Sequence, residues 1–122
     1  MIIEHLALLN PWMTDYQVTQ FQMIDMNLRL NVKISFVDGS ALFIKEIMID
    51  GQQRKYAYHW QDSQCRLICR WDNAPDWPDV NTFPHHKHLP GGIEASTEIE
   101  AVAIFTAIKT RFETGTTGEP HA

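Results

Sequence analysis

The segment Leu28-Arg29-Leu30-Asn31-Val32-Lys33-Ile34-Ser35-Phe36 alternates apolar and polar residues along its length. A period of two is typical of a β-strand with one buried face. Asp38-Gly39 follows, a pair favoured in two-residue hairpin loops because both loop positions need positive φ angles. Residues 41–49 then return as the predicted antiparallel partner. Residues 28–49 therefore predict a β-hairpin and indicate a fold built on an antiparallel sheet.

Further strands are predicted on both sides of this hairpin. Residues 16–25 are rich in β-branched and aromatic side chains and predict a first strand. Residues 55–61 and 66–72 predict one more hairpin. The turns between them are predicted at residues 50–53 and 62–65. Residues 2–9, which end at Asn10-Pro11, fit either a first helix or an arm strand.

The C-terminal third follows a different pattern. Four prolines, at positions 75, 78, 84 and 90, predict one long irregular segment over residues 74–92. Thr97-x-x-Glu100 is a capping-box pattern. It precedes an apolar stripe at helical spacing, formed by Ala101, Phe105, Ile108 and Phe112. We therefore expect an α+β fold, an antiparallel meander of about five strands with a C-terminal amphipathic helix packed on one face. One domain spans residues 1–114, and residues 115–122 form a disordered tail.

The register of the sheet predicts which side chains share a face. A two-residue loop at Asp38-Gly39 sets Ile34 opposite Phe43, and a four-residue turn at 50–53 sets Ile47 opposite Tyr56. Phe43 and Ile47 then point into the core with Tyr58 and Trp60. The opposite face carries Glu46, Lys55, His59, Arg70 and Asp72.

Composition limits the classes of protein that fit the chain. It has 122 residues and a formal net charge of −5, so one domain is expected and the overall charge does not indicate nucleic-acid binding. The first residues lack a signal-peptide pattern, and no apolar run reaches the roughly 20 residues of a membrane helix. We expect a cytoplasmic protein with no membrane association. Cys65 and Cys69 are then expected to be reduced, because one strand holds them too far apart for a disulfide.

The predicted polar face combines a carboxylate, an imidazole and a guanidinium. Glu46, His59 and Arg70 fit the roles of base, acid and phosphate anchor. The alternative is an ordinary solvated face, in which Lys55 and Asp72 form a cross-strand pair.

A second candidate site is Pro84-His85-His86-Lys87-His88, which holds three of the six histidines. Histidine suits acid–base catalysis near neutral pH and is also a common metal ligand. No cysteine or carboxylate accompanies the run at ligand spacing, so we expect no bound metal and no cofactor. Lys87 is a candidate phosphate-binding residue.

Three blocks in these regions carry a family resemblance. They are Lys55-Tyr56-Ala57-Tyr58-His59-Trp60-Gln61, Arg70-Trp71-Asp72-Asn73-Ala74-Pro75, and Thr82-Phe83-Pro84-His85-His86-Lys87-His88. In this order they resemble the TumE family of toxin components. The resemblance implies a small toxin that is neutralised by a co-encoded antitoxin and acts on RNA. The family pattern continues with a histidine after Asn-Ala-Pro, whereas this chain has Asp76.

The sequence thus predicts a type II toxin that acts as a metal-independent endoribonuclease. His59 or Glu46 is the base, and one of His85, His86 and His88 is the acid. Arg70 and Lys87 clamp the phosphate, and Asp72 orients a histidine or the arginine. The alternatives are a non-catalytic module that binds RNA or protein with the same face, and a metal-dependent hydrolase that uses residues 85–88. Expected partners are the cognate antitoxin and an RNA substrate, and a homo-oligomer remains an open option.

Overall fold

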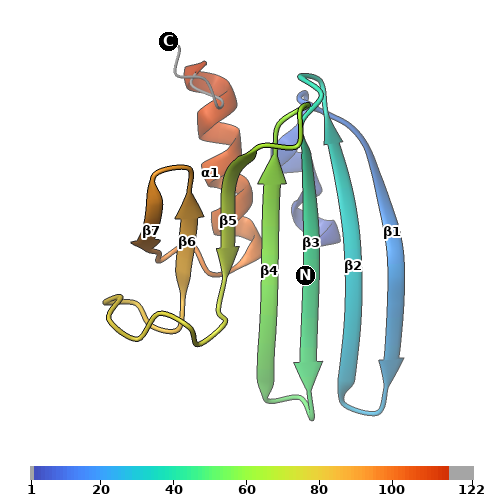
Figure 1. The fold of residues 1–122 in the computed structure, drawn as a ribbon. Helices are drawn as coiled ribbons and strands as arrows, with labels where there is room; N and C mark the ends of the chain where they lie inside the picture. The colour runs from blue at the N-terminus through green and yellow to red at the C-terminus, as the bar shows by residue number, and fades with distance from the viewer. Residues whose placement is uncertain (1, 116–122) are drawn as a thin grey trace.

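The computed structural model describes residues 2–115, which form one antiparallel sheet with two helices on the same face (Figure 1). Every strand pairs with its neighbours in sequence, so the predicted α+β meander is confirmed, with seven strands rather than about five. The elements are η1 (a 3-10 helix, Ile3–Leu9), β1 (Met13–Ile24), β2 (Asn27–Phe36), β3 (Ala41–Ile49), β4 (Gln53–Gln61), β5 (Leu67–Asp72), β6 (His86–Leu89), β7 (Gly92–Ala95) and α1 (Ala101–Thr114).

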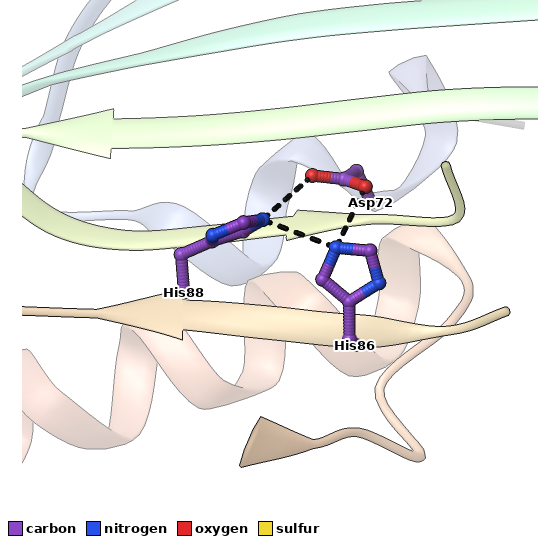
Figure 2. Close-up of side chains that lie close together, drawn as sticks. All are labelled: Asp72, His86 and His88. Carbon is purple, nitrogen blue, oxygen red and sulfur yellow. Dashed lines mark hydrogen bonds and ion pairs between the residues drawn. The ribbon is translucent and has the colours of Figure 1, made fainter. Parts of the chain in front are cut away.

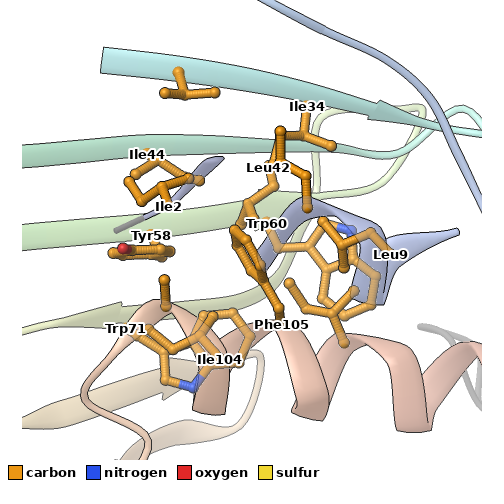
Figure 3. Packing of buried hydrophobic residues seen from close by; sticks show 14 of the residues in the cluster. Ile2, Leu9, Ile34, Leu42, Ile44, Tyr58, Trp60, Trp71, Ile104 and Phe105 are labelled. Atoms are coloured by element: carbon orange, nitrogen blue, oxygen red, sulfur yellow. The ribbon is translucent and has the colours of Figure 1, made fainter. Parts of the chain in front are cut away.

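The hydrophobic core lies between the sheet and the helices (Figure 3). Tyr58 and Trp60 of β4 and Phe105 of α1 have no exposed surface, and the Tyr58 and Phe105 rings meet edge to face with centroids 6.3 Å apart. Burial of a large apolar side chain stabilises the fold by about 1.5–3 kcal/mol. The predicted helical stripe is confirmed, because Ala101 and Ile108 are also buried and Phe112 packs against the core.

The turn between β2 and β3 contains three residues, so the predicted two-residue loop is wrong. Gly39 takes φ +84° and donates its N–H to the Phe36 carbonyl, while the Asp38 carboxylate accepts the Ser40 N–H. Three-residue loops of this kind place a glycine in the left-handed region. Ile34 therefore pairs with Leu42 instead of Phe43.

That one-residue shift inverts β3, because side chains alternate between the faces of a sheet. Leu42 and Ile44 are buried, whereas Phe43 is 39% exposed. The next turn also has three residues instead of four, so Glu46 pairs with Tyr56. The two shifts cancel at β4, which keeps its predicted faces. Among the predicted faces of the strands, only that of β3, and with it the placement of Glu46, is wrong.

The predicted irregular segment over residues 74–92 contains β6 and the start of β7, so this prediction is also wrong. Pro84 and Pro90 flank β6 without interrupting its ladder to β5. Pro90-Gly91 is the loop that joins β6 to β7, where Leu89 pairs with Gly92.

The start of α1 differs from the predicted capping box. The N-cap residue is Glu100, and its side chain makes no capping hydrogen bond. Residues 97–100 stay outside the helix because the Ser96 hydroxyl accepts the Glu98 N–H, and the Glu98 carboxylate accepts hydrogen bonds from Trp71 and Lys87. These bonds hold the chain in a bend before the helix begins.

The remaining predictions concern the two ends and the cysteines. The helical option for the first segment is confirmed, since Leu6 and Leu9 of η1 are buried. Cys69 is buried on β5, whereas Cys65 lies exposed in the turn before it, so the predicted placement of both on one strand is wrong; both thiols are free. Gly115 ends α1 in the left-handed conformation. The rest of the predicted disordered tail, residues 116–122, lies outside the described residues.

Candidate functional site

The sheet divides the predicted site residues into two groups. We call the face that η1 and α1 leave uncovered the open face, and the other the helix-side face (Figure 1). The pairing pattern brings five of the predicted residues together on the open face: His59, Arg70, Asp72, His86 and His88. It separates three from them: Glu46, His85 and Lys87.

Strand register places the open-face residues side by side. His59 of β4 pairs with Arg70 of β5, and Arg70 pairs with His88 of β6. Two residues further along β5, on the same face, Asp72 pairs with His86. Directly opposed residues have Cβ atoms about 4.5–5.5 Å apart, so these side chains are in contact range.

Asp72 is buried. Figure 2 shows its carboxylate beside the rings of His86 and His88. Its Oδ1 lies 3.0 Å from His86 Nε2, and its Oδ2 lies 3.2 Å from His88 Nε2. Oδ1 also accepts the Ala74 N–H at 3.0 Å, and Oδ2 accepts the Arg70 Nε–H at 3.2 Å. Both carboxylate oxygens are thus held in place, and the carboxylate orients two imidazoles and one guanidinium.

The protons in this cluster can be assigned in part. His86 Nδ1 lies 2.9 Å from the Pro84 carbonyl, which can only accept, so Nδ1 carries a proton. In the neutral ring His86 Nε2 then presents a lone pair to the Asp72 carboxylate and to His88 Nε2, 3.1 Å away. Two lone pairs at such a distance repel. The cluster of Asp72, His86 and His88 is therefore suited to hold a cation, either an added proton or a metal ion.

His59 is the candidate base. Its Nδ1 lies 3.5 Å from Arg70 Nη1, a long contact. Partial burial, followed by the charge of Arg70, lowers the pKa of His59 from its usual 6.5. A lowered pKa keeps the imidazole neutral at physiological pH, the form that accepts a proton.

A groove of about 820 Å³ borders this group on the open face. Arg70, Asp72 and His88 line it together with residues 73–76 and Pro84 from the connection between β5 and β6. Asp76, which stands where the resemblance implies a histidine, therefore lies at the edge of the candidate site.

Glu46 makes a different set of contacts on the helix-side face. Its two oxygens accept hydrogen bonds from Arg54 Nε at 2.9 Å and Nη2 at 2.7 Å, and the Tyr58 hydroxyl donates to Oε2 at 2.5 Å. Burial and the nearby Glu46 charge raise the pKa of Tyr58. The carboxylate is thus fully paired, in the manner of a structural ion pair.

His85 and Lys87 also contact partners away from the open face. The His85 ring stacks on Tyr56, and its Nδ1 lies 2.9 Å from the Tyr56 hydroxyl. Burial and the Arg54 charge lower the pKa of His85, and burial raises that of Tyr56 to about 12. Lys87 donates to Glu98 Oε1 at 3.3 Å. Alternation along β6 explains the split between Lys87 and its two histidine neighbours.

Sequence reasoning missed the contact of Asp72 with His86 and His88 because it missed β6. The signal was present: His86-Lys87-His88-Leu89 precedes the turn pair Pro90-Gly91 and the short apolar-polar run Ile93-Glu94. Sequence reasoning also missed Phe43 and Lys45 on the open face, because the predicted loop was one residue too short.

Comparison with known proteins gives one match. The family model described as "Toxin TumE" matches residues 3–114, nearly the whole chain. No curated protein and no solved structure matches significantly. No helix within the described residues has the length and apolar character needed to cross a membrane.

Proposed function

This chain belongs to the TumE family of toxins, and we propose that it is a metal-independent endoribonuclease of a type II toxin–antitoxin module. Membership of a toxin family implies a cognate antitoxin partner. The observation that carries the proposal is the meeting of His59, Arg70 and the Asp72–His88 pair on the open face, where Arg70, Asp72 and His88 line a groove. An acid, a base and a cation at one place are the groups that RNA cleavage requires.

The proposed reaction is an attack of the ribose 2′-oxygen on the adjacent phosphorus. His59 removes the 2′-hydroxyl proton, and the 2′-oxygen–phosphorus bond forms as the 5′-oxygen–phosphorus bond breaks. His88 donates a proton to the leaving 5′-oxygen, while Asp72 holds its ring. The Arg70 guanidinium neutralises the charge that develops on the phosphorane oxygens. The products are a 2′,3′-cyclic phosphate and a 5′-hydroxyl.

The position of each candidate residue in the structure favours one candidate for the acid, one for the base and one for the phosphate-binding residue. His88 is favoured over His86 as the acid because it lines the groove, whereas His86 is only 1% exposed. His59 is favoured over Glu46 as the base, and Arg70 acts without Lys87, because Glu46 and Lys87 are paired on the helix-side face.

The test is cleavage of a short RNA by the purified, untagged chain in the presence of EDTA. We expect cyclic-phosphate and 5′-hydroxyl ends, and no cleavage when the nucleotide at the scission site is 2′-deoxy. Expression without the antitoxin should slow growth, and His59→Ala should relieve it. Intact RNA together with slowed growth would contradict the nuclease and favour the non-catalytic binding module.

A metal-dependent hydrolase is the second candidate, favoured by the cluster of Asp72, His86 and His88. Two imidazoles and a carboxylate on one side of a metal ion form a known ligand set. The two histidine Nε2 atoms lie 3.1 Å apart, and each of them lies 3.0–3.2 Å from a different oxygen of Asp72. Neighbouring ligand atoms in an octahedral complex with bonds of about 2.1 Å lie about 3.0 Å apart. The His86 Nδ1–H bond to a carbonyl also matches the way ligating histidines are commonly oriented.

Elemental analysis separates the two candidates. The proposed mechanism predicts far less than one zinc or manganese per chain after purification without a histidine tag. A metal close to stoichiometric, lost in His88→Ala, together with cleavage that EDTA abolishes, would replace the proposed mechanism by the hydrolase. His88→Ala is preferred to His86→Ala because His86 is buried and its loss endangers folding.

A further inference from the structure

The Lys and Arg side chains are distributed unevenly over the fold. The chain has ten of them and a formal net charge of −5. Five project from β2 to β5 on the open face: Arg29, Lys33, Lys45, Lys55 and Arg70. Asp72 is the single carboxylate on this face of β2 to β5 within the described residues, and it is nearly buried. Half of the cations of an acidic protein therefore share one uncovered surface.

These cations lack the partners found elsewhere. On the other surfaces Arg54, Arg66 and Lys87 each pair with a carboxylate. On the open face Arg70 pairs with Asp72, and none of the other four makes an ion pair with any residue in the range 2–115. Unpaired cations that gather on one face create a local positive potential, to which a polyanion is attracted.

Two rows cross the strands and end at the candidate site. The first runs through Lys33, Phe43, His59, Arg70 and His88, and the second through Asn31, Lys45, Ala57, Asp72 and His86. From β2 to β6 each row crosses four strand spacings, about 19 Å. A row of this length accommodates several nucleotides, with Lys33 and Lys45 at one end and the reacting groups at the other.

Phe43 gives the first row an aromatic surface. Phe43 is 39% exposed, and Lys33 Nζ lies 5.7 Å from the ring centroid. An exposed aromatic ring among cations is the arrangement with which proteins bind single-stranded nucleic acid, because any base stacks on it. A base-paired helix buries its bases and offers no face for such stacking.

We propose that the open face of β2 to β5 binds single-stranded RNA, with Lys33 and Lys45 on phosphates and a base stacked on Phe43. The inference rests on the proposed action on RNA and deepens it by naming the substrate class and the path to the site. The strand crosses the sheet along the first row, so that the phosphate to be cleaved lies between His59 and His88.

Binding of an uncleavable strand tests the phosphate contacts. The probe is a labelled 2′-O-methyl oligoribonucleotide of mixed sequence, which lacks the attacking hydroxyl, and affinity is measured by fluorescence anisotropy over a range of salt concentrations. Each phosphate contact contributes about 0.7 to the slope of log K against log salt for single strands. Lys33→Gln/Lys45→Gln should therefore reduce the slope by about 1.4. The control, Arg66→Gln/Lys109→Gln, removes the same charge outside this face and should leave the slope unchanged. Equal losses in both double variants would overturn the proposal.

The proposed stacking of a base on Phe43 is tested with one variant and a matched control. Phe43→Leu keeps an apolar side chain but loses the ring, and should weaken binding roughly 5- to 150-fold. Phe21→Leu changes a more exposed ring on the helix-side face of β1 and should have no effect. Wild-type affinity in Phe43→Leu would overturn the stacking contact. A duplex probe bound as tightly as the single strand would overturn the substrate class.

The same data distinguish this inference from the proposed function. Loss of probe binding in the face variants, with no cleavage of natural RNA by the wild type, would support the face and refute the nuclease. Unchanged binding in those variants, with cleavage by the wild type, would refute RNA binding by the open face but would leave the proposed nuclease activity supported.

Discussion

The two faces of this sheet differ in whether their charged side chains have ion-pair and hydrogen-bond partners. On the helix-side face Glu46 accepts two hydrogen bonds from Arg54 and one from Tyr58, so the charge and both oxygens are satisfied. On the open face Lys45, the residue next to Glu46 in sequence, is exposed and makes no ion pair with any described residue. There the two oxygens of Asp72 lie 3.0 Å from His86 Nε2 and 3.2 Å from His88 Nε2.

This difference helps to distinguish charged residues that stabilise the fold from charged residues that are available for binding or catalysis. A buried charge lowers stability unless it is paired, so a fully paired group is explained by folding alone. The close contacts of Asp72 with two imidazoles, and a face of cations without ion pairs, are not explained by folding in this way. Such groups remain available to bind a ligand. The predictions below test this division, from the largest expected effect to the smallest.

The largest effect is expected for His59→Ala, on the open face. Loss of the base should lower the rate of RNA cleavage about 100- to 10,000-fold. His59 is half-buried, and its side chain makes a long contact with Arg70 and a hydrogen bond with Gln61, so the thermal unfolding midpoint should change little. A variant that unfolds near the temperature of the assay would show that the face is structural after all.

Arg70→Lys is expected to fail nearly as badly as Arg70→Ala, with a loss of about 100-fold in kcat/KM. A point charge does not replace the planar guanidinium, which contacts Asp72 through Nε and presents Nη1 beside His59. Rates for both variants, measured with one RNA substrate, check this. Full activity in Arg70→Lys would reduce the role of Arg70 to a source of positive potential.

On the helix-side face we expect the main effect of Glu46→Ala to be on stability. Removal of the carboxylate leaves Arg54 and the Tyr58 hydroxyl without their partner and should lower the free energy of unfolding by about 2–3 kcal/mol. Urea denaturation measures it, and Lys45→Gln, its neighbour on the open face, should stay within about 0.5 kcal/mol of wild type. Cleavage per folded molecule should be unchanged in Glu46→Ala. If it is abolished in a stable variant, Glu46 is the base that the sequence first indicated.

The pH dependence of His59 provides a smaller effect. Burial and the charge of Arg70 lower the pKa of His59 in the folded state below its usual 6.5. In the window between the folded-state pKa and pH 6.5, His59 is therefore neutral in the folded chain but protonated in the unfolded chain. Its contribution to stability is present above that window and is lost as pH falls through it. An NMR titration of the ring should give a midpoint below 6.5, and Arg70→Gln should move it upward. A midpoint at or above 6.5 in the wild type would contradict the assigned environment.

The smallest effect is expected for Thr97→Ala. The capping-box pattern predicts a loss of about 1 kcal/mol, but α1 begins at Ala101 with Glu100 as its N-cap residue. We therefore expect a change in unfolding free energy within about 0.5 kcal/mol. A loss of 1 kcal/mol or more would show that Thr97 does cap the helix in solution.

Sequence patterns predicted most of the fold because local composition carries much of the information. Alternation in β2 and the helical stripe of α1 each reflect burial of one side of a single element. The faces of β4 and β5 were also predicted, which placed His59, Arg70 and Asp72 together. The face of β3 was wrong because it depended on the length of one loop. A three-residue turn at Gly39 moved Glu46 to the helix-side face and Phe43 and Lys45 to the open face.

By itself the sequence determined the class of fold, the existence of five of the strands and of the helix, and the residues from which a site could be made. Only the tertiary structure decided which of those residues meet. Register is set by hydrogen bonds in the turns, and a shift of one residue reverses a strand without changing its composition. The histidines at 86 and 88 reach Asp72 because β6 adds to the edge of β5. That long-range pairing depends on the backbone ladder between two strands, which no local pattern in either strand specifies.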